Sequence, residues 1–209
     1  MYLSRIKLNT TLRKTMQALA APNLFHGAVE SSEPDGRTRK LWRTDTLRGE
    51  QYLLVLSEKE LDLSGAAEQF GYGEYETKPY DGLLDRITPG SRWQFRLRAN
   101  PTIQKSRTDG RRSKVLAHIT TAYQEEWLRR QAERNGFSLA DGEWLVTGSK
   151  WYIFRKNKTQ KQSVRMLGVT FEGVLTVTDA EKFRNALICG IGREKAFGMG
   201  LLTIAGAGK

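Results

Sequence analysis

The sequence predicts an α+β fold made of two halves that share one order of elements: strand, helix, strand, strand, helix, strand. Three observations carry this prediction. Apolar and polar residues alternate in the segments that open the two halves, residues 2–8 and 92–98. A helical period follows each of these segments, and two consecutive strands follow each helix. A βαββαβ order is typical of the ferredoxin-like fold, so we expect two tandem ferredoxin-like domains, residues 1–88 and 89–209.

The first half begins with a half-buried strand over residues 2–8, because its apolar side chains share one face and Arg5 and Lys7 share the other. A helix follows, and we expect Thr11 to cap it and Pro22 to end it. Its expected inner face consists of Leu12, Met16 and Leu19.

The sequence pattern in the middle of the first half predicts a β-hairpin. The segments "KLWRTD" and "YLLVLS" have the composition of strands, and "LRGE" joins them as a turn. The acidic stretch that follows is less regular, and it predicts a helix over 60–70 and a strand over 73–79.

The second half opens with the cleanest strand of the sequence, in which Trp93, Phe95 and Leu97 alternate with polar residues. The segment "NPTIQKSRTDGRRSK" follows as a polar, basic loop or flexible hairpin, with the Asp109-Gly110 pair at its tip.

Two helices and three further strands complete this half. Thr121 and Gln124 have the spacing of a capping box, so a helix is expected to begin there and to end at Asn135-Gly136. Strands over about 144–155 and 164–177 flank a basic turn. Asp179 is expected to cap the last helix, and "MGLLTIA" is expected to form the final strand.

Positive charge is concentrated in two segments. The 209-residue chain has a formal net charge of +11, from 34 Lys and Arg against 23 Asp and Glu. Residues 92–118 hold eight cations and one acid, and residues 150–165 hold six cations and no acid. These two segments account for the whole excess, so a polyanion is the expected partner.

The same composition excludes several classes of protein. The single cysteine, Cys189, cannot build a disulfide framework or a zinc site, which fits a reducing cytoplasm. The segment "MYLSRIKLN" lacks the apolar core of a signal peptide, and no run of about 18 uncharged apolar residues is present. We therefore expect a soluble, intracellular protein that has no membrane partner.

The segment "GIGREKAFGMGLL" contains four glycines and two cations. A Walker loop or a dinucleotide fingerprint opens a helix, whereas this segment follows a predicted helix and enters a strand, which disfavours nucleotide binding. Two interpretations stay open. The glycines provide a helix C-cap at Gly190 and a tight turn, or they let the backbone approach an RNA phosphate that Arg193 and Lys195 attract.

Five motifs give the sequence a family resemblance: "YLSRI", His26 after the first helix, "FRLRANP", "FEGVLTV" and "GIGREKAFGMGLL". In order and spacing they resemble the CasE family, the repeat-processing endoribonucleases of type I-E CRISPR systems in the RAMP superfamily. The resemblance implies a hydrolase without metal or cofactor that cleaves CRISPR repeat RNA at the 3′ base of its stem. It implies 2′,3′-cyclic phosphate and 5′-hydroxyl ends on the products. It also implies a cytoplasmic, prokaryotic protein that stays bound to its product, the crRNA, as a subunit of the Cascade complex for antiviral defence.

The resemblance implies that His26 is the catalytic histidine. Without the resemblance, we would interpret His26 as an ordinary surface or partly buried histidine. A histidine can take the proton of a 2′-hydroxyl or protonate a leaving 5′-oxygen. Many relatives have a tyrosine three residues earlier, where this chain has Asn23, whose amide can orient the sugar or phosphate but cannot act as an acid. Lys195, or a cation of residues 155–161, is then the candidate assistant.

The expected RNA-binding residues are the cations of the two basic segments and the glycine-rich segment. An A-form RNA stem has a deep groove in which side chains cannot easily read the bases. A flexible basic arm is suited to recognise the shape and the phosphates of such a stem. His118, at the end of this arm, is interpreted as a bystander or an RNA contact. The candidates are Arg98, Lys105, Arg107, Arg111, Arg112, Lys114, Arg155, Lys156, Lys158, Lys161, Gly190, Gly192, Arg193, Gly198 and Gly200.

Two other functions are compatible with parts of this pattern. A non-catalytic subunit that binds an RNA stem-loop would explain the basic segments and the Asn23 position. A metabolic enzyme of ferredoxin-like fold would have no affinity for RNA, and the two basic segments argue against it.

Overall fold

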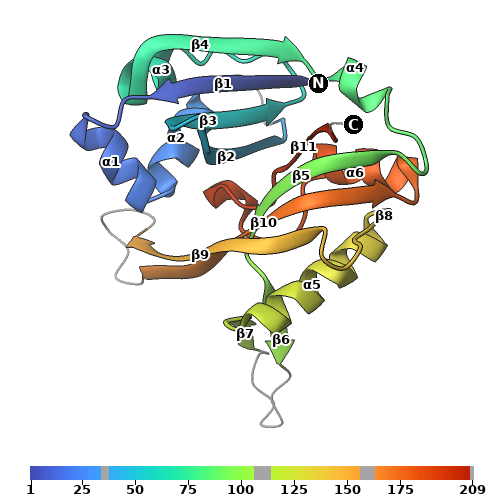
Figure 1. The fold of residues 1–209 in the computed structure, drawn as a ribbon. Coiled ribbons are helices and arrows are strands. Elements are labelled where there is room, and N and C mark those ends of the chain that lie inside the picture. The colour runs from blue at the N-terminus through green and yellow to red at the C-terminus, as the bar shows by residue number, and fades with distance from the viewer. Residues whose placement is uncertain (34–37, 106–113, 156–162, 208–209) are drawn as a thin grey trace.

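The computed structural model describes residues 1–33, 38–105, 114–155 and 163–207. Two antiparallel sheets lie one above the other, the first built from the N-terminal half and the second from the C-terminal half (Figure 1). The segment between them contains the short helix α4 (Asp81–Leu84). The domain boundary expected at residue 88 falls in this segment and stays a prediction. No helix in the described part of the chain is long and apolar enough to cross a membrane.

The first sheet has the strand order β2-β3-β1-β4. All of its paired strands run antiparallel. This order and the intervening helices are those of a ferredoxin-like unit. Its elements are β1 (Tyr2–Leu8), α1 (Arg13–Ala20), α2 (Asn23–Ser31), β2 (Lys40–Leu47), β3 (Glu50–Ser57), α3 (Ser64–Phe70) and β4 (Gly71–Pro79).

The second sheet repeats this arrangement with the order β11-β5-β10-β8, and β9 also pairs with β10. A separate two-stranded hairpin, β6 (Thr102–Lys105) with β7 (Lys114–Ala117), is inserted after β5. The other elements are β5 (Arg92–Ala99), α5 (Thr121–Arg134), β8 (Phe137–Ser138), β9 (Trp144–Arg155), β10 (Ser163–Val177), α6 (Ala180–Cys189), the short 3₁₀ helix η1 (Lys195–Phe197) and β11 (Leu202–Gly206). The predicted fold class, two tandem ferredoxin-like units, is confirmed.

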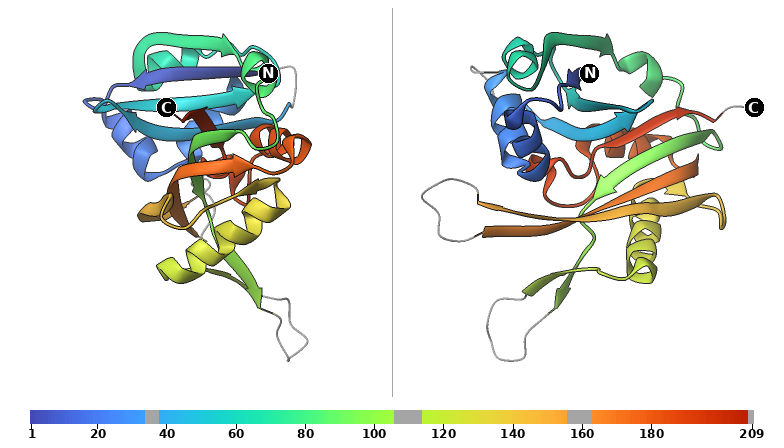
Figure 2. Two further views of the ribbon diagram at one scale, coloured as in Figure 1. Left: turned by 45° about the vertical axis from the view of Figure 1, so that its right-hand side comes forward. Right: turned by 60° about the vertical axis from the view of Figure 1, so that its left-hand side comes forward.

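The long β9–β10 hairpin extends beyond the rest of the second sheet and reaches the side of the molecule where α1 lies (Figure 2). There the Lys150 ammonium group donates a hydrogen bond to the carbonyl of Leu19, at 3.3 Å. The described part of this hairpin therefore contacts the N-terminal half through Lys150.

The first predicted helix, α1, ends at Ala20, before Pro22, as expected, but its predicted cap and its predicted inner face are wrong. The N-cap residue is Leu12 instead of Thr11, and no side chain makes a capping hydrogen bond there. A second helix, α2, was not expected, and it begins directly after Pro22; a proline with φ of −56° suits this place because it lacks only an N–H that a helix N-terminus leaves unpaired anyway. The buried residues of α1 are Thr15 and Ala18, whereas Met16 is 53% exposed. The hydroxyl of Thr15 donates a hydrogen bond to the carbonyl of Phe70, and this bond determines which face of the helix is buried.

The predicted capping box of α5 is also wrong. The N-cap residue is Thr120, and its side chain makes no capping hydrogen bond. Gln124 instead donates from its amide nitrogen to the carbonyls of His118 and Ile119, at 2.9 and 3.1 Å. Asp179, in contrast, caps α6 as expected by accepting a hydrogen bond from the backbone N–H of Lys182.

The two sheets share an apolar core and one buried charged contact. Leu41, Leu54 and Leu56 of the first sheet belong to the core cluster of the second. Arg43 of β2 is fully buried, binds Asp45 with two hydrogen bonds, and donates to carbonyls of the second half. The junction between the two halves is thus packed and bonded, which fixes the relative position of any groups on either side of it.

Candidate active site

Helix α2 carries His26 on a half-exposed face. Asn23, His26 and Glu30 are separated by three and four residues, so they lie on one side of the helix. Phe25 and Val29 are buried on the other side and anchor the helix to its sheet. The side chain of His26 is 36% exposed, which leaves its imidazole accessible to a ligand.

The glycine-rich segment of the C-terminal half lies against this helix. It leaves α6 at Gly190, turns through η1 and enters β11. Phe197 of η1 meets the imidazole of His26 edge to face, with ring centroids 6.1 Å apart. Two regions separated by about 170 residues in sequence are therefore neighbours, and the expected catalytic histidine and the expected phosphate loop belong to one site.

All four glycines of this segment meet a structural requirement. Gly190, Gly192, Gly198 and Gly200 have positive φ, a conformation that side chains rarely adopt. A Cβ at Gly198 would come within 2.7 Å of the Trp42 ring, and one at Gly200 within 2.7 Å of the Ile191 carbonyl. Packing and backbone conformation therefore explain all four glycines, which favours the structural one of the two interpretations left open by the sequence. Phosphate contact by these glycines stays a prediction.

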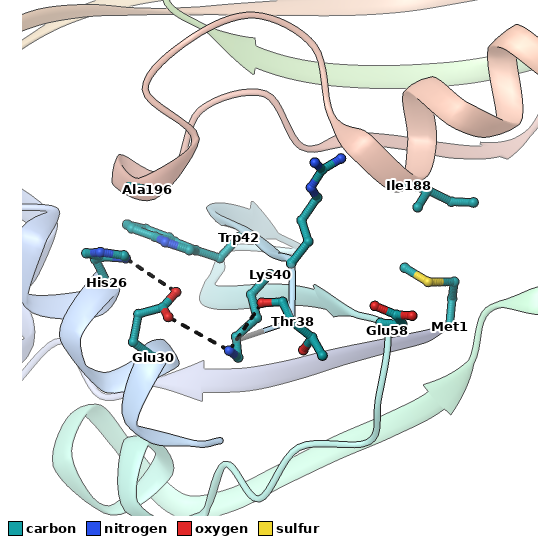
Figure 3. Close-up of a pocket in the computed structure, with 10 residues that line it drawn as sticks. Met1, His26, Glu30, Thr38, Lys40, Trp42, Glu58, Ile188 and Ala196 are labelled. Atoms are coloured by element: carbon teal, nitrogen blue, oxygen red, sulfur yellow. Dashed lines mark hydrogen bonds and ion pairs between the residues drawn. The ribbon is translucent and has the colours of Figure 1, made fainter. Parts of the chain in front are cut away.

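A pocket of about 780 Å³ opens beside His26, between α2, β2 and the glycine-rich segment (Figure 3). His26, Glu30 and Trp42 line one end, close to Ala196 of η1. Arg39 lines it as well. The pocket is thus walled by residues from both halves of the chain.

A row of charged groups extends from His26 along the pocket. Oε1 of Glu30 lies 3.8 Å from Nδ1 of His26, and Oε2 of Glu30 lies 3.8 Å from the Nζ of Lys40. Lys40 is fully buried and makes a closer ion pair of 2.8 Å with Glu33. Hydrogen bonds from Lys40 and Thr38 lower the pKa of Glu33 to about 2, so this carboxylate is ionised at neutral pH.

Lys195 directly precedes Ala196, the residue of the glycine-rich segment that lines the pocket. Its ammonium group donates a 2.7 Å hydrogen bond to the carbonyl of Cys189 at the end of α6. Burial lowers the pKa of Lys195, and the positive charge of Arg39 lowers this pKa further. Arg39 is exposed and forms no ion pair within the described residues. Two cations thus lie close together beside the pocket, an arrangement that an anion would stabilise.

The structure distributes the other predicted RNA-binding residues over several places. Arg98 lies at the junction of the halves, where it donates hydrogen bonds to the hydroxyls of Thr44 and Thr170. Arg155, at the end of β9, and Arg193, in the glycine-rich segment, are exposed. The remaining cations, or their side chains, lie outside the described residues: Lys105, Arg107, Arg111, Arg112, Lys114, Lys156, Lys158 and Lys161. His118 is buried and stacks on Tyr123, with ring centroids 5.6 Å apart.

Sequence reasoning missed three residues of this site: Glu30, Arg39 and Lys40. Glu30 stands four residues after His26, so the spacing would have indicated a pair if a helix had been expected there. Nothing in the sequence distinguishes Arg39 and Lys40 from other strand cations. In the described ranges, no group of three or more His, Cys, Asp and Glu side chains is placed to hold a metal ion.

Comparisons with known proteins agree on one family. Residues 1–206 match the family described as CRISPR associated protein. The CRISPR-associated endoribonuclease Cse3 of Thermus thermophilus is 34% identical over 217 residues, which cover 98% of this chain and all of the relative. A structure of Cse3 bound to a 19-nucleotide RNA superposes with a TM-score of 0.82 at 31% identity, covering 98% of this chain and 100% of that one. Thermus thermophilus Cse3 bound to an RNA that represents a pre-cleavage complex gives a TM-score of 0.80 at 31% identity, with 98% of both chains covered.

Proposed function

This chain belongs to the CasE (Cse3) family of CRISPR-associated proteins, and from that premise we propose that it is an endoribonuclease of CRISPR RNA processing. It binds the stem-loop of the repeat and cleaves at the 3′ base of the stem. The mature crRNA stays bound, and the protein acts as a subunit of a Cascade complex in the prokaryotic cytoplasm. The relatives support the reaction class, because Cse3 is named an endoribonuclease and has been solved with RNA in a pre-cleavage complex.

The observation that carries this proposal is the placement of His26. Its imidazole is half exposed, it lines the pocket between the two halves, and Phe197 of the glycine-rich segment packs against it. A titratable side chain in a pocket beside two cations is the arrangement that acid/base chemistry on a phosphodiester requires.

The proposed reaction is an internal transesterification. The 2′-oxygen attacks the neighbouring phosphorus while its proton passes to a base, and the bond from phosphorus to the 5′-oxygen breaks. The 5′-oxygen receives a proton, so the products are a 2′,3′-cyclic phosphate and a 5′-hydroxyl. His26 performs one of these proton transfers, since imidazole exchanges protons readily near neutral pH. The RNA supplies its own nucleophile, so this chemistry requires no metal ion.

The charge that develops on the phosphorane needs compensation, and we assign this role to Lys195 and Arg39. Lys195 is held by the Cys189 carbonyl, and Arg39 lines the same pocket as His26. Fixed cations of this kind stabilise a transition state more than its ground state because negative charge grows during the reaction. Asn23, on the same face of α2 as His26, orients the sugar or the phosphate through its amide group.

We assign the binding of the stem-loop to the two basic segments. Residues 92–118 and 150–165 concentrate the positive charge, and the second segment lies on the β9–β10 hairpin that reaches α1. Arg155 and Arg193 are exposed and available to phosphates, whereas Arg98 contributes through its place at the junction. The glycine-rich segment presents its backbone to the RNA beside them.

Two experiments test the proposal. Repeat RNA is incubated with the protein in EDTA, and in parallel a substrate with a 2′-deoxy group at the scissile nucleotide is used. We expect cleavage in EDTA and none of the deoxy substrate; the opposite result in either arm excludes the internal attack. In the second experiment His26→Ala should abolish cleavage and leave RNA binding intact, and undiminished cleavage would remove His26 from the mechanism.

The second candidate is a non-catalytic RNA-binding subunit, favoured by the asparagine at position 23, which cannot serve as an acid. A denaturing gel of the repeat RNA, run beside a native gel of the same incubation, separates the two functions. An enzyme shortens the RNA, whereas a binding subunit retards it on the native gel and leaves its length unchanged.

A further inference from the structure

We propose that Glu30, held in place by Lys40, is a positioning residue that orients the His26 imidazole for the cleavage reaction. The inference rests on the proposed function, because it assigns a partner to the histidine of that same site. It concerns a side chain that none of the family motifs quoted above contains.

The two oxygens of Glu30 face different partners. Oε1 points to Nδ1 of His26 and Oε2 points to the ammonium group of Lys40, each at 3.8 Å, as the dashed lines in Figure 3 show. Glu30 follows His26 by one helical turn, so the helix itself brings the carboxylate and the imidazole to one side. The carboxylate therefore lies between the histidine and a fixed positive charge.

Lys40 is fixed because it is fully buried. A buried ammonium group is costly unless it is paired, and Glu33 supplies the pairing at 2.8 Å. Glu33 is itself held by Thr38, whose hydroxyl donates to it at 2.6 Å, and the Lys40 ammonium also reaches the Thr38 carbonyl at 3.5 Å. With these partners in place, the position of the Lys40 charge is determined, and the Glu30 carboxylate is drawn toward it.

This arrangement selects one form of the imidazole. An ionised carboxylate only accepts hydrogen bonds, so Nδ1 of His26 carries the proton that faces Glu30. The other nitrogen, Nε2, is then free to accept a proton from the RNA, as in other sites where a carboxylate holds a histidine in one tautomer. The 3.8 Å separation exceeds a hydrogen bond, and such contacts shorten when substrate completes a catalytic site.

Electrostatic repulsion alone would make the negative charge of Glu30 unfavourable for RNA binding. A negative charge in a pocket that receives a polyanion weakens binding, so a purely electrostatic role predicts that neutralising Glu30 would improve RNA affinity and leave the rate unchanged or higher. A positioning role predicts a slower chemical step with affinity unchanged or improved. The two roles therefore give opposite signs in the rate.

The test uses Glu30→Gln and Glu30→Ala in the full-length protein. Single-turnover cleavage of repeat RNA measures the chemical step, and the 2′-deoxy RNA measures affinity without cleavage. We expect the rate to fall about tenfold or more, as for other groups that orient a catalytic histidine, and the affinity to stay equal or rise. The matched control is Glu58→Gln, because Glu58 is an exposed acid at the far end of the pocket, beside Met1 (Figure 3). A rate for both Glu30 variants within about twofold of the unmodified protein, or an equal loss in the control, overturns the proposal.

A second readout does not depend on cleavage. The ring-nitrogen resonances of ¹⁵N-labelled histidine report which nitrogen is protonated, and the chain has only two histidines, so His26→Ala assigns the signals. We expect the Nδ1-protonated form in the unmodified protein. In Glu30→Gln the amide oxygen turns to Lys40 and its NH₂ group to His26, which reverses the tautomer. An unchanged tautomer overturns the inference on Glu30, whereas intact repeat RNA with the unmodified protein overturns the proposed function instead.

Discussion

Arg43 is the buried cation that joins the two sheets, and its removal gives a measurable prediction. Its guanidinium binds the Asp45 carboxylate at 2.9 and 2.6 Å and donates to the carbonyls of Arg96 and Leu201 at 2.9 and 2.6 Å. A further hydrogen bond, of 2.7 Å, goes to the hydroxyl of Thr203. Burial lowers the pKa of Arg43 and the charge of Asp45 opposes this shift, so the pair compensates a charge that would otherwise be costly.

The expected loss follows from what Arg43→Met leaves behind. The Asp45 side chain is only 3% exposed, so it would keep a buried negative charge without its closest partner. Breaking a buried ion pair costs about 3–5 kcal/mol. Arg96, whose Nη1 lies 3.7 Å from Asp45, retains part of the compensation, so we expect the lower end, about 3 kcal/mol. For a chain of this size that corresponds to a melting temperature lower by roughly 6–12 °C.

The assay is urea unfolding of Arg43→Met, Asp45→Leu and the double variant, followed by circular dichroism. Replacing both partners leaves no buried charge, so the double variant should be more stable than Arg43→Met alone. A loss below about 1 kcal/mol for Arg43→Met, or a double variant that loses the sum of both single losses, would refute the reasoning.

Three further predictions follow from local geometry. Gly198→Ala should cost about 2–4 kcal/mol, because its φ is +76° and its Cβ would approach the Trp42 ring, whereas Gly65→Ala in α3, with nothing within 4 Å, should gain up to about 1 kcal/mol; equal unfolding midpoints would contradict this. The pKa of Glu33 is lowered from 4.5 to about 2, so its stabilising effect is complete above pH 4.5 and is lost as the pH falls toward 2. The stability gap between the unmodified protein and Glu33→Gln should therefore narrow over this range in acid titrations, and a constant gap would disprove the assignment. Arg155→Ala should reduce the slope of log affinity for repeat RNA against log salt by about 1, and an unchanged slope removes Arg155 from the interface.

Strand patterns and turn residues were predictable because they depend on neighbouring residues. Trp93, Phe95 and Leu97 alternate with polar residues, and all three are buried in β5 as expected. The β2–β3 turn at Arg48 and Gly49 has positive φ at both positions, which the "LRGE" composition permits. The order of these elements sufficed for the fold class.

Predictions failed where a local signal had two structural outcomes. Pro22 follows the end of α1 as expected, but a proline can also precede a helix, and the packing of Phe25 and Val29 in the first core decides that a second helix begins there. Met16 has the spacing from its apolar neighbours that is typical of a buried helix face. The burial of Thr15, whose hydroxyl bonds to the carbonyl of Phe70, turns that face toward solvent instead. In both cases tertiary packing outweighed the local pattern.

The sequence by itself determined the two ferredoxin-like units, the family resemblance and the identity of His26 as the candidate catalytic group, because periodicity and motif order are properties of the linear chain. Only the tertiary structure decided what surrounds that histidine. The docking of the two sheets brings Phe197 to the His26 ring, and the burial of Lys40 places Glu30 between the two charges. These contacts depend on how separate elements pack, and residues far apart in sequence or on different elements carry no local signal of their distance in space.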